Sequence, residues 1–340
     1  MKHTCAILLL MAISSSAIAV QDHTKTPDRP PIGIVIHGGA GTINQAQMSA
    51  SQQQAYEAAL TLAIETGYKV LQQGGSSLDA VTQAVIVLED SPLFNAGKGA
   101  VYTFDETHEL DASIMQGQDR NAGAVAGVTT IKNPILLARA VMEQSEHVML
   151  AGAGAEAFAD TLKLARVDNS YFNTAFRYDA LKRAKQALAP QPHQAKIPFD
   201  PVWRMGTVGA VAIDQAGNLA AATSTGGMTA KRYGRIGDAP VIGAGNFADN
   251  SSCAVSATGH GEYFIRYQVA SDICARVKYQ GQSAAQASSA VMSELAQVGG
   301  TGGVIVVDAA GALSWAFNTE GMYRAMLGAN TPLKVEIFAR

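Results

Sequence analysis

The chain has 340 residues, of which 48% are hydrophobic and 16% charged, and its formal net charge is −3. This length is enough for one large hydrophobic core or two modest ones. The slightly acidic balance, without a basic stripe, argues against nucleic acid as a partner and leaves small molecules and peptides.

The first 19 residues are typical of an export signal. Lys2 and His3 precede the apolar run Cys5–Ile13, and the small residues of Ser14–Ala19 follow. The apolar run is too short to span a bilayer, and no later run is long enough. We therefore expect cleavage after Ala19 and an exported, periplasmic protein with no membrane segment once the signal is removed.

The first half of the remaining chain alternates strand patterns with helical ones. Strand patterns occupy residues 32–36, 101–104, 110–115 and 122–131. Helical patterns occupy residues 52–73, 78–88 and 134–142, with Ser76 or Ser77 as the N-cap of the second. Because 101–104 and 110–115 are separated by a short polar stretch, they predict a hairpin in which His108 is solvated.

Residues 160–204 differ from the rest in composition. A weak helical pattern over 174–189 is followed by four prolines among scattered lysines and arginines. Such a composition resists packing, so we expect a flexible segment over about 160–206. A chain break is well tolerated in a solvated segment of this kind.

Residues 148–157 imitate a dinucleotide-binding turn, because a strand-like run is followed by GxGxxA. A strand with a ribose-binding acid should then follow about 20 residues later, and the sequence has none there. We therefore expect no nucleotide site.

Two stretches of the second half echo each other. Residues 209–220 and 303–314 each consist of an apolar strand, an Asp-x-Ala-Gly turn and a return strand, which predicts two antiparallel hairpins. Their near-continuous apolar strands are typical of sheets buried on both faces. We therefore expect an α+β fold of four αββα layers, with helices outside two stacked sheets.

Cys253 and Cys274 are the cysteines that follow the signal. A domain of this size needs no covalent staple, so we expect buried thiols rather than a disulfide. Their spacing does not match a zinc site.

The pentapeptide Met205–Gly209, with sequence MGTVG, begins a strand pattern. If the Gly206–Thr207 bond is cut, Thr207 becomes a nucleophile whose own α-amino group, with a pKa of about 7.7–8.0, takes the hydroxyl proton. Gly206 suits a twisted, reachable peptide because it has no Cβ. His37 and His260 are also candidate bases, but both lie in glycine clusters where we expect the main chain to matter more.

Further groups for acyl chemistry follow along the chain. Thr225, at a glycine turn, can orient an amine or a hydroxyl. Arg235 and Asp238 can hold the carboxylate and the ammonium of an amino acid. Thr258 and Gly259 can stabilise an oxyanion. Taken singly, each of these residues is typical of an ordinary turn or surface position. Together they provide the groups needed to bind and hydrolyse an aspartyl-like substrate.

Six motifs are specific in combination. They are His37–Gly41, Leu88–Gly97, Gly206–Gly209, Thr223–Gly227, Gly234–Asp238 and Thr258–Glu262. With them, the chain resembles the plant-type L-asparaginases and isoaspartyl peptidases, which are N-terminal-nucleophile (Ntn) hydrolases of αββα architecture. The similarity covers about residues 32–328.

The resemblance implies autocatalytic cleavage between Gly206 and Thr207. It gives an α-subunit of residues 20–206 and a β-subunit of residues 207–340, which stay together as one folded domain and pair into an (αβ)2 dimer. The implied roles are Thr207 as nucleophile, Thr225 near its amino group, Arg235 on the substrate α-carboxylate, Asp238 on its α-ammonium, Thr258 and Gly259 in the oxyanion hole, and Asn95 shaping the site.

The resemblance also implies a structural sodium ion. Its ligands would be the main-chain carbonyls of Leu88, Glu89, Ser91, Phe94, Ala96 and Lys98. The chemistry itself requires no redox or organic cofactor.

The expected reaction is hydrolysis of β-aspartyl (isoaspartyl) dipeptides and of the side-chain amide of L-asparagine, through an aspartyl ester of Thr207. One alternative is a glycosylasparaginase, because the residues do not define the room around the leaving group. An alternative of another class is an exported amino-acid-binding protein, which would use Arg235 and Asp238 only to hold its ligand and would remain uncut.

Overall fold

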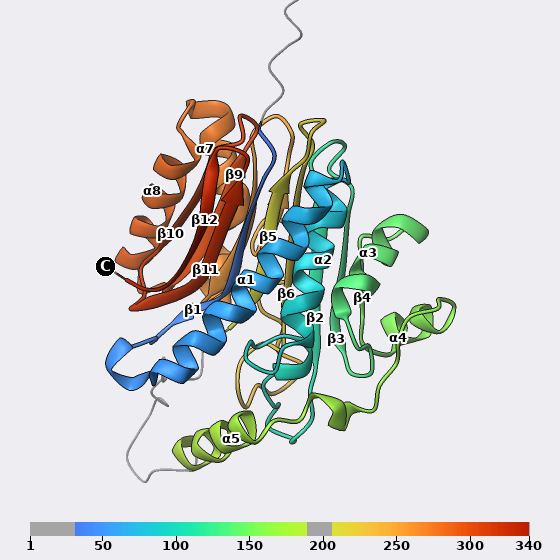
Figure 1. The fold of residues 1–340 in the computed structure, drawn as a ribbon. Coiled ribbons are helices and arrows are strands. Elements are labelled where there is room, and N and C mark those ends of the chain that lie inside the picture. Colours follow the sequence, from blue (N-terminus) through green and yellow to red (C-terminus); the bar gives the residue numbers. More distant parts are fainter. Residues whose placement is uncertain (1–30, 189–205, 340) are drawn as a thin grey trace, which may run out of the picture.

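Two sheets stack face to face, and helices cover the outer face of each (Figure 1). This arrangement comes from a computed structural model, which describes residues 31–188 and 206–339. The expected export signal lies outside these residues. Within them, no helix has both the length and the apolar character needed to cross a membrane.

The larger sheet has eight strands in the order β12-β11-β1-β5-β6-β2-β3-β4. Their bounds are β1 Gly33–Gly41, β2 Leu110–Gln116, β3 Ala122–Val128, β4 Met149–Ala151, β5 Val208–Ile213, β6 Leu219–Thr225, β11 Gly321–Gly328 and β12 Thr331–Phe338. The β3–β4 pair is parallel, and the other pairs are antiparallel. Strands β1 and β5 are neighbours in the interior of this sheet, in a register that sets His37 opposite Gly209.

The smaller sheet has four strands in the order β10-β9-β8-β7. Their bounds are β7 Asn246–Ala248, β8 Cys253–Gly259, β9 Gly302–Asp308 and β10 Leu313–Phe317. Both predicted hairpins are confirmed, as β5–β6 and as β9–β10. The sequence echo therefore contributes one hairpin to each sheet.

The helices and 3-10 turns follow the predicted order in the first half of the chain. Their bounds are η1 Gln45–Gln47, α1 Ala50–Gln72, α2 Ser77–Asp90, η2 Gly97–Gly99, α3 Pro134–Gln144, α4 Gly152–Asp160, η3 Asn169–Phe172, α5 Ala175–Leu188, α6 Gly261–Tyr267, α7 Val269–Gln280 and α8 Ala284–Gln297. The N-cap of α2 is Ser76, whose hydroxyl accepts a hydrogen bond from the Asp79 amide at 3.0 Å.

Burial on both faces of the sheets explains the apolar runs. In β1, Ile34 and Ile36 pack toward α1 and α2, whereas Val35 between them packs toward the second sheet. A third cluster lies between the smaller sheet and the helices α7 and α8. Alternate strand residues thus enter different layers, and the four-layer α+β fold expected from the sequence is confirmed.

The predicted hairpin of residues 101–104 and 110–115 is wrong. Strand β2 pairs with β3 and β6, and Thr103 makes only an isolated bridge to Lys231. His108 is buried rather than solvated, with its ring nitrogens 3.1 Å from the Val101 carbonyl oxygen and 3.0 Å from Asn173 Oδ1. The polar residues beside it suggested a solvated turn, but distant parts of the chain cover it.

The described part of the predicted flexible segment is also folded. Residues 169–188 form η3 and α5, which are anchored by the buried side chains of Phe172 and Leu181. Arg177 is buried as well, and its Nε donates to the Gly99 carbonyl at 2.8 Å. A few anchoring residues are enough to dock a helix whose average composition is polar. Residues 189–205 lie outside the described residues.

The expectation of free thiols is wrong, because Cys253 and Cys274 form a disulfide with their Cα atoms 5.3 Å apart. Cys253 begins β8 and Cys274 lies in α7, and both belong to the cluster between these elements. The size of the domain indicates only that a disulfide is not required for stability. The two cysteines nevertheless come within bridging distance because α7 packs on β8.

Replacing both cysteines by alanine should lower the stability of the protein by about 3 kcal/mol, because the bridge closes a loop of 21 residues in the unfolded chain. Thermal and denaturant unfolding with and without a thiol reductant would measure this. The reductant should destabilise the parent protein and leave the double variant unchanged. Equal stability of the oxidised parent and the double variant would contradict the prediction.

Candidate active site

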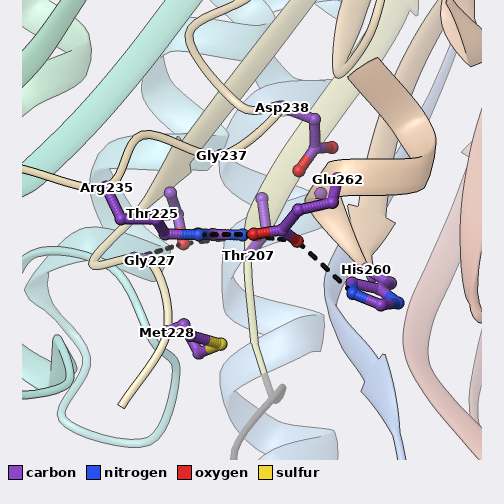
Figure 2. Close-up of a pocket in the computed structure, with 11 residues that line it drawn as sticks. Thr207, Thr225, Gly227, Met228, Arg235, Gly237, Asp238, His260 and Glu262 are labelled. Atoms are coloured by element: carbon purple, nitrogen blue, oxygen red, sulfur yellow. Dashed lines mark hydrogen bonds and ion pairs between the residues drawn. The ribbon is translucent and has the colours of Figure 1, made fainter. Parts of the chain in front are cut away.

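A small pocket lies where β5 begins and where β6 and β8 end (Figure 2). It is lined by Thr207, Thr225, Gly227, Met228, Arg235, Gly237, Asp238, Gly259, His260, Gly261 and Glu262. Five of the predicted site residues are among them. Its free volume of about 20 Å³ is room for a water molecule, so an aspartyl substrate requires some side chain to move.

Thr207 and Thr225 meet at the floor of this pocket. Thr207 directly precedes β5, and the β5–β6 register sets Val208 opposite Ser224. Thr207 Oγ1 donates to Thr225 Oγ1 at 3.3 Å, and Thr225 Oγ1 also accepts from the Gly227 amide at 3.0 Å. The two hydroxyls are therefore close together, whereas the expected position of Thr225 near the amino group of Thr207 remains a prediction.

The Gly206–Thr207 peptide is held from two sides. Gly206 has φ +116°, a conformation that favours glycine, and a Cβ there would lie 2.7 Å from Asn95 Cβ. On the other side, a Cβ on Gly39 would lie 2.5 Å from Gly206 Cα. The glycines of the His37–Gly41 motif thus let the main chain of β1 approach this bond.

His37 holds the main chain beside the same bond. Its Nδ1 lies 3.0 Å from the Thr207 carbonyl oxygen and its Nε2 lies 3.0 Å from Ser256 Oγ. Burial lowers the pKa of His37 to about 3, so the ring is neutral. A carbonyl oxygen can only accept, so Nδ1 carries the proton and Nε2 accepts from Ser256. His37 therefore positions the main chain rather than acting as a base toward the Thr207 hydroxyl.

Arg235 is engaged by a residue that the sequence analysis did not single out. Its Nε and Nη2 donate to the two carboxylate oxygens of Glu262 at 3.0 and 3.1 Å, and His260 Nε2 lies 3.4 Å from the same carboxylate. Figure 2 shows this ion pair among the residues that line the pocket. The Arg235 guanidinium is thus oriented toward the pocket by a carboxylate that a substrate carboxylate can replace. The available signal was the position of Glu262 in the Thr258–Glu262 motif.

Asp238 is buried beside this pair. Burial, the largest effect, raises the pKa of Asp238 to about 7, although the charge of Arg235 opposes the rise. Its Oδ2 has no hydrogen-bond partner among the residues that the structure describes. A buried carboxylate oxygen without a partner is suited to receive a ligand ammonium.

Thr258 and Gly259 end β8 at the pocket wall. Gly259 lines the pocket, with φ +149°, whereas Thr258 is not among the lining residues. Within the described chain, the buried Thr258 Oγ1 has no hydrogen-bond partner. A buried hydroxyl left unpaired is costly, so Thr258 Oγ1 is a candidate donor to an oxyanion.

Asn95 braces the turn that follows Thr225. Its side-chain amide donates to the Gly227 carbonyl at 2.7 Å and its Oδ1 accepts from the Val101 amide at 2.9 Å. Its own carbonyl accepts from the Gly226 amide at 3.1 Å. Asn95 does not line the pocket, and it shapes the site through the turn at 226–227.

Asn95→Asp should lower kcat/KM for the expected β-aspartyl and asparagine substrates at least tenfold and lower the free energy of unfolding by about 1–3 kcal/mol. The side-chain amide that donates to the Gly227 carbonyl would be replaced by a carboxylate oxygen, so two acceptors would face each other. Steady-state kinetics and denaturant unfolding would measure both effects. Asn121→Asp is the matched control, since Asn121 also donates its side-chain amide to a carbonyl, that of Met142, away from the pocket. Equal kinetic effects of the two variants would contradict the role of Asn95.

The loop expected to hold sodium is tightly folded. A Cβ on Gly99 would lie 2.1 Å from the Phe94 carbonyl oxygen and 2.7 Å from that of Pro92, so the main chain folds back onto these oxygens. The ammonium of Lys98 donates to the Tyr171 carbonyl and lies 4.3 Å from the centre of the Tyr171 ring. The side chain of Lys98 therefore points toward η3. These features are compatible with main-chain ligation, and the sodium ion remains a prediction.

The four layers, with a threonine at the start of a central strand facing this pocket, define an N-terminal-nucleophile hydrolase fold. The chain belongs to the asparaginase family, whose pattern matches residues 30–337. Over 293 residues it is 55% identical to an isoaspartyl peptidase of Escherichia coli, covering 86% of this chain and 91% of that protein. An isoaspartyl peptidase of Salmonella typhimurium is 54% identical, with 86% and 94% covered.

The similarity extends to eukaryotes. A probable isoaspartyl peptidase/L-asparaginase of Arabidopsis thaliana is 40% identical over 309 residues, which cover 86% of this chain and 94% of that protein. The protein is thus an enzyme of the isoaspartyl peptidase/L-asparaginase family, as its motifs suggested. Membership of this family excludes the alternative of a non-catalytic binding protein.

Proposed function

We propose that the protein is an exported, autoprocessing threonine hydrolase that cleaves β-aspartyl dipeptides and the side-chain amide of L-asparagine. One observation carries the proposal. Thr207, which directly follows Gly206, lines a pocket that is also lined by Arg235, Asp238 and Gly259. The names of the bacterial and plant relatives support the same substrates.

In the maturation step, Thr207 Oγ attacks the carbonyl carbon of Gly206 and the Thr207 nitrogen leaves with a proton. The resulting ester is hydrolysed by water, which gives a carboxylate on Gly206 and a free α-amino group on Thr207. His37, Gly39 and Asn95 hold the peptide so that the hydroxyl stays beside the carbonyl carbon.

In turnover, the new α-amino group takes the Thr207 hydroxyl proton, and Oγ attacks the side-chain carbonyl of the substrate. Thr258 and Gly259 donate to the oxygen that becomes negative. Ammonia or the peptide amine leaves with the proton, and water hydrolyses the aspartyl ester. Throughout, the substrate carboxylate replaces Glu262 on Arg235, and Asp238 receives the ammonium.

We extend the proposal to location and assembly. The signal pattern of residues 1–19 supports export, and the disulfide between Cys253 and Cys274 is typical of an oxidising compartment. We also infer an (αβ)2 dimer of cleaved chains and a structural sodium ion on the carbonyls of loop 88–98, both from the family resemblance.

Intact-mass measurement and N-terminal sequencing of the purified protein test this proposal directly. We expect two chains, residues 20–206 and 207–340, the second beginning Thr-Val-Gly-Ala-Val. Hydrolysis of a β-aspartyl dipeptide, compared with an N-glycosyl asparagine, separates the proposed activity from glycosylasparaginase. Active protein that consists of one uncut chain would refute the mechanism, and preference for the glycosyl substrate would refute the specificity.

A further inference from the structure

A second cavity, of about 270 Å³, adjoins the pocket at Gly259. It is lined by Ala40, Gly41, Thr42, Gly259, Thr301, Asn318, Thr319 and Glu320. These residues come from the end of β1, the end of β8, the residue before β9 and the turn between β10 and β11. Its volume of about 270 Å³ lies just below the range of about 300–1,000 Å³ for drug-sized ligands, so it has room for a small group such as an amino-acid side chain.

The position of this cavity relative to the reacting atoms suggests what it receives. In the proposed reaction, Arg235 and Asp238 hold the aspartyl ends and Gly259 faces the carbonyl oxygen, so the leaving amine is the remaining substituent. The cavity shares Gly259 with the pocket that contains Thr207. Neither Arg235 nor Asp238 lines it. It therefore adjoins the pocket at the proposed oxyanion residue, away from the two side chains that would hold the aspartyl ends.

Among the residues that line the cavity, Glu320 has the one charged side chain. Asn318 already forms hydrogen bonds within the protein, since its Oδ1 accepts from the Gly302 amide at 2.8 Å and its Nδ2 donates to the Gly300 carbonyl at 3.0 Å. Thr319 Oγ1 donates to the Gly321 carbonyl at 2.9 Å. Glu320 is exposed, and no cationic side chain lines the cavity. A leaving residue therefore meets a single carboxylate.

We propose that this cavity is the subsite for the leaving residue of the β-aspartyl dipeptide, and that Glu320 makes it prefer a lysine or arginine side chain over an acidic one. This inference rests on the proposed hydrolase function. A cationic side chain gains an ion pair with Glu320, whereas an acidic side chain is repelled. Asparagine releases ammonia, which does not extend into the cavity, so its turnover is independent of Glu320.

The test compares kcat/KM of the mature enzyme for β-Asp-Lys, β-Asp-Ala, β-Asp-Glu and asparagine. The wild type should favour β-Asp-Lys over β-Asp-Glu. Glu320→Gln should reduce this ratio about two- to fivefold, which is the effect of an exposed ion pair, and Glu320→Lys should reverse the preference. Added salt should weaken the wild-type preference but not that of Glu320→Gln. Glu146→Gln, an exposed carboxylate change between α3 and β4, is the control for net charge.

The outcomes separate this subsite from the proposed function. If all variants hydrolyse β-Asp-Ala and asparagine normally but keep the wild-type Lys/Glu ratio, the subsite is wrong and the hydrolase function stands. If Glu146→Gln changes the ratio as much as Glu320→Gln does, the effect is one of net charge, and the subsite is again wrong. If the wild type hydrolyses none of the substrates, the proposed function itself fails.

Discussion

Thr207→Ala should yield a single uncut chain after signal removal and no measurable hydrolysis of asparagine or β-aspartyl dipeptides. Without the hydroxyl, neither the Gly206 carbonyl nor the substrate carbonyl meets a nucleophile. The fold should survive, because Thr207 contributes one weak side-chain hydrogen bond of 3.3 Å to Thr225. Mass spectrometry of the chain would measure processing, ammonia release from asparagine and amino-acid release from the dipeptides would measure hydrolysis, and circular dichroism would verify folding.

Thr207→Ser is the matched control for this prediction. Serine keeps the hydroxyl and, once cleaved, the α-amino group, so processing and turnover should continue at a reduced rate. The reduction is expected because the threonine methyl restricts χ1 and holds Oγ in line, whereas serine samples more rotamers. An alanine variant that still matured and turned over substrate would exclude Thr207 as the nucleophile.

The features predictable from sequence were those encoded by neighbouring residues. Apolar runs with glycine turns predicted β1 and the hairpins β5–β6 and β9–β10, and serine caps predicted the start of α2. The layers followed from the two-sided burial of these strands. Local patterns, however, do not state which strand pairs with which, and for this reason the 101–104 hairpin was wrong.

The site shows the same limit at the level of single residues. Thr207, Thr225 and Asp238 could be proposed because the chemistry needs their types in recognisable motifs. That Arg235 is engaged by Glu262, and that His37 binds the Thr207 carbonyl across 170 residues of chain, depends on tertiary packing. The same applies to the bridge between Cys253 and Cys274.

Asp238→Asn should lower kcat/KM for β-aspartyl dipeptides about a hundredfold or more, because the substrate ammonium loses its buried counter-charge. The pH dependence is a sharper test. Burial raises the pKa of Asp238 to about 7 in the free protein, and the ammonium binds the ionised form. Ionisation of Asp238 should therefore make the activity of the wild type fall as the pH drops below about 7, and this group alone contributes roughly tenfold per pH unit at the limit.

The Thr207 amine adds a second step to this profile, since it must be neutral and ordinarily titrates at about 7.7–8.0. Asp238→Asn should remove the lower step and keep the upper one. A pH profile of kcat/KM for the two proteins, after mass spectrometry has shown that both are cleaved, would reveal this. An unchanged lower step in Asp238→Asn would mean that another group controls it.

The raised pKa of Asp238 also predicts that the stability of the folded protein falls as the pH rises, whereas the activity increases. This effect is best measured in the Thr207→Ala protein, which stays uncut and therefore has no free amine at residue 207 that could titrate. Between the unfolded pKa of about 3.9 and the folded value of about 7, the folded state binds more protons, so stability falls as the pH rises. Adding Asp238→Asn should remove this cost. The double variant should therefore gain stability over Thr207→Ala at pH 8 but not at pH 4. If the two variants differ in free energy of unfolding by the same amount at pH 4 and pH 8, then ionising Asp238 does not destabilise the folded protein. In that case the burial of Asp238 could not be the reason that it binds the substrate ammonium.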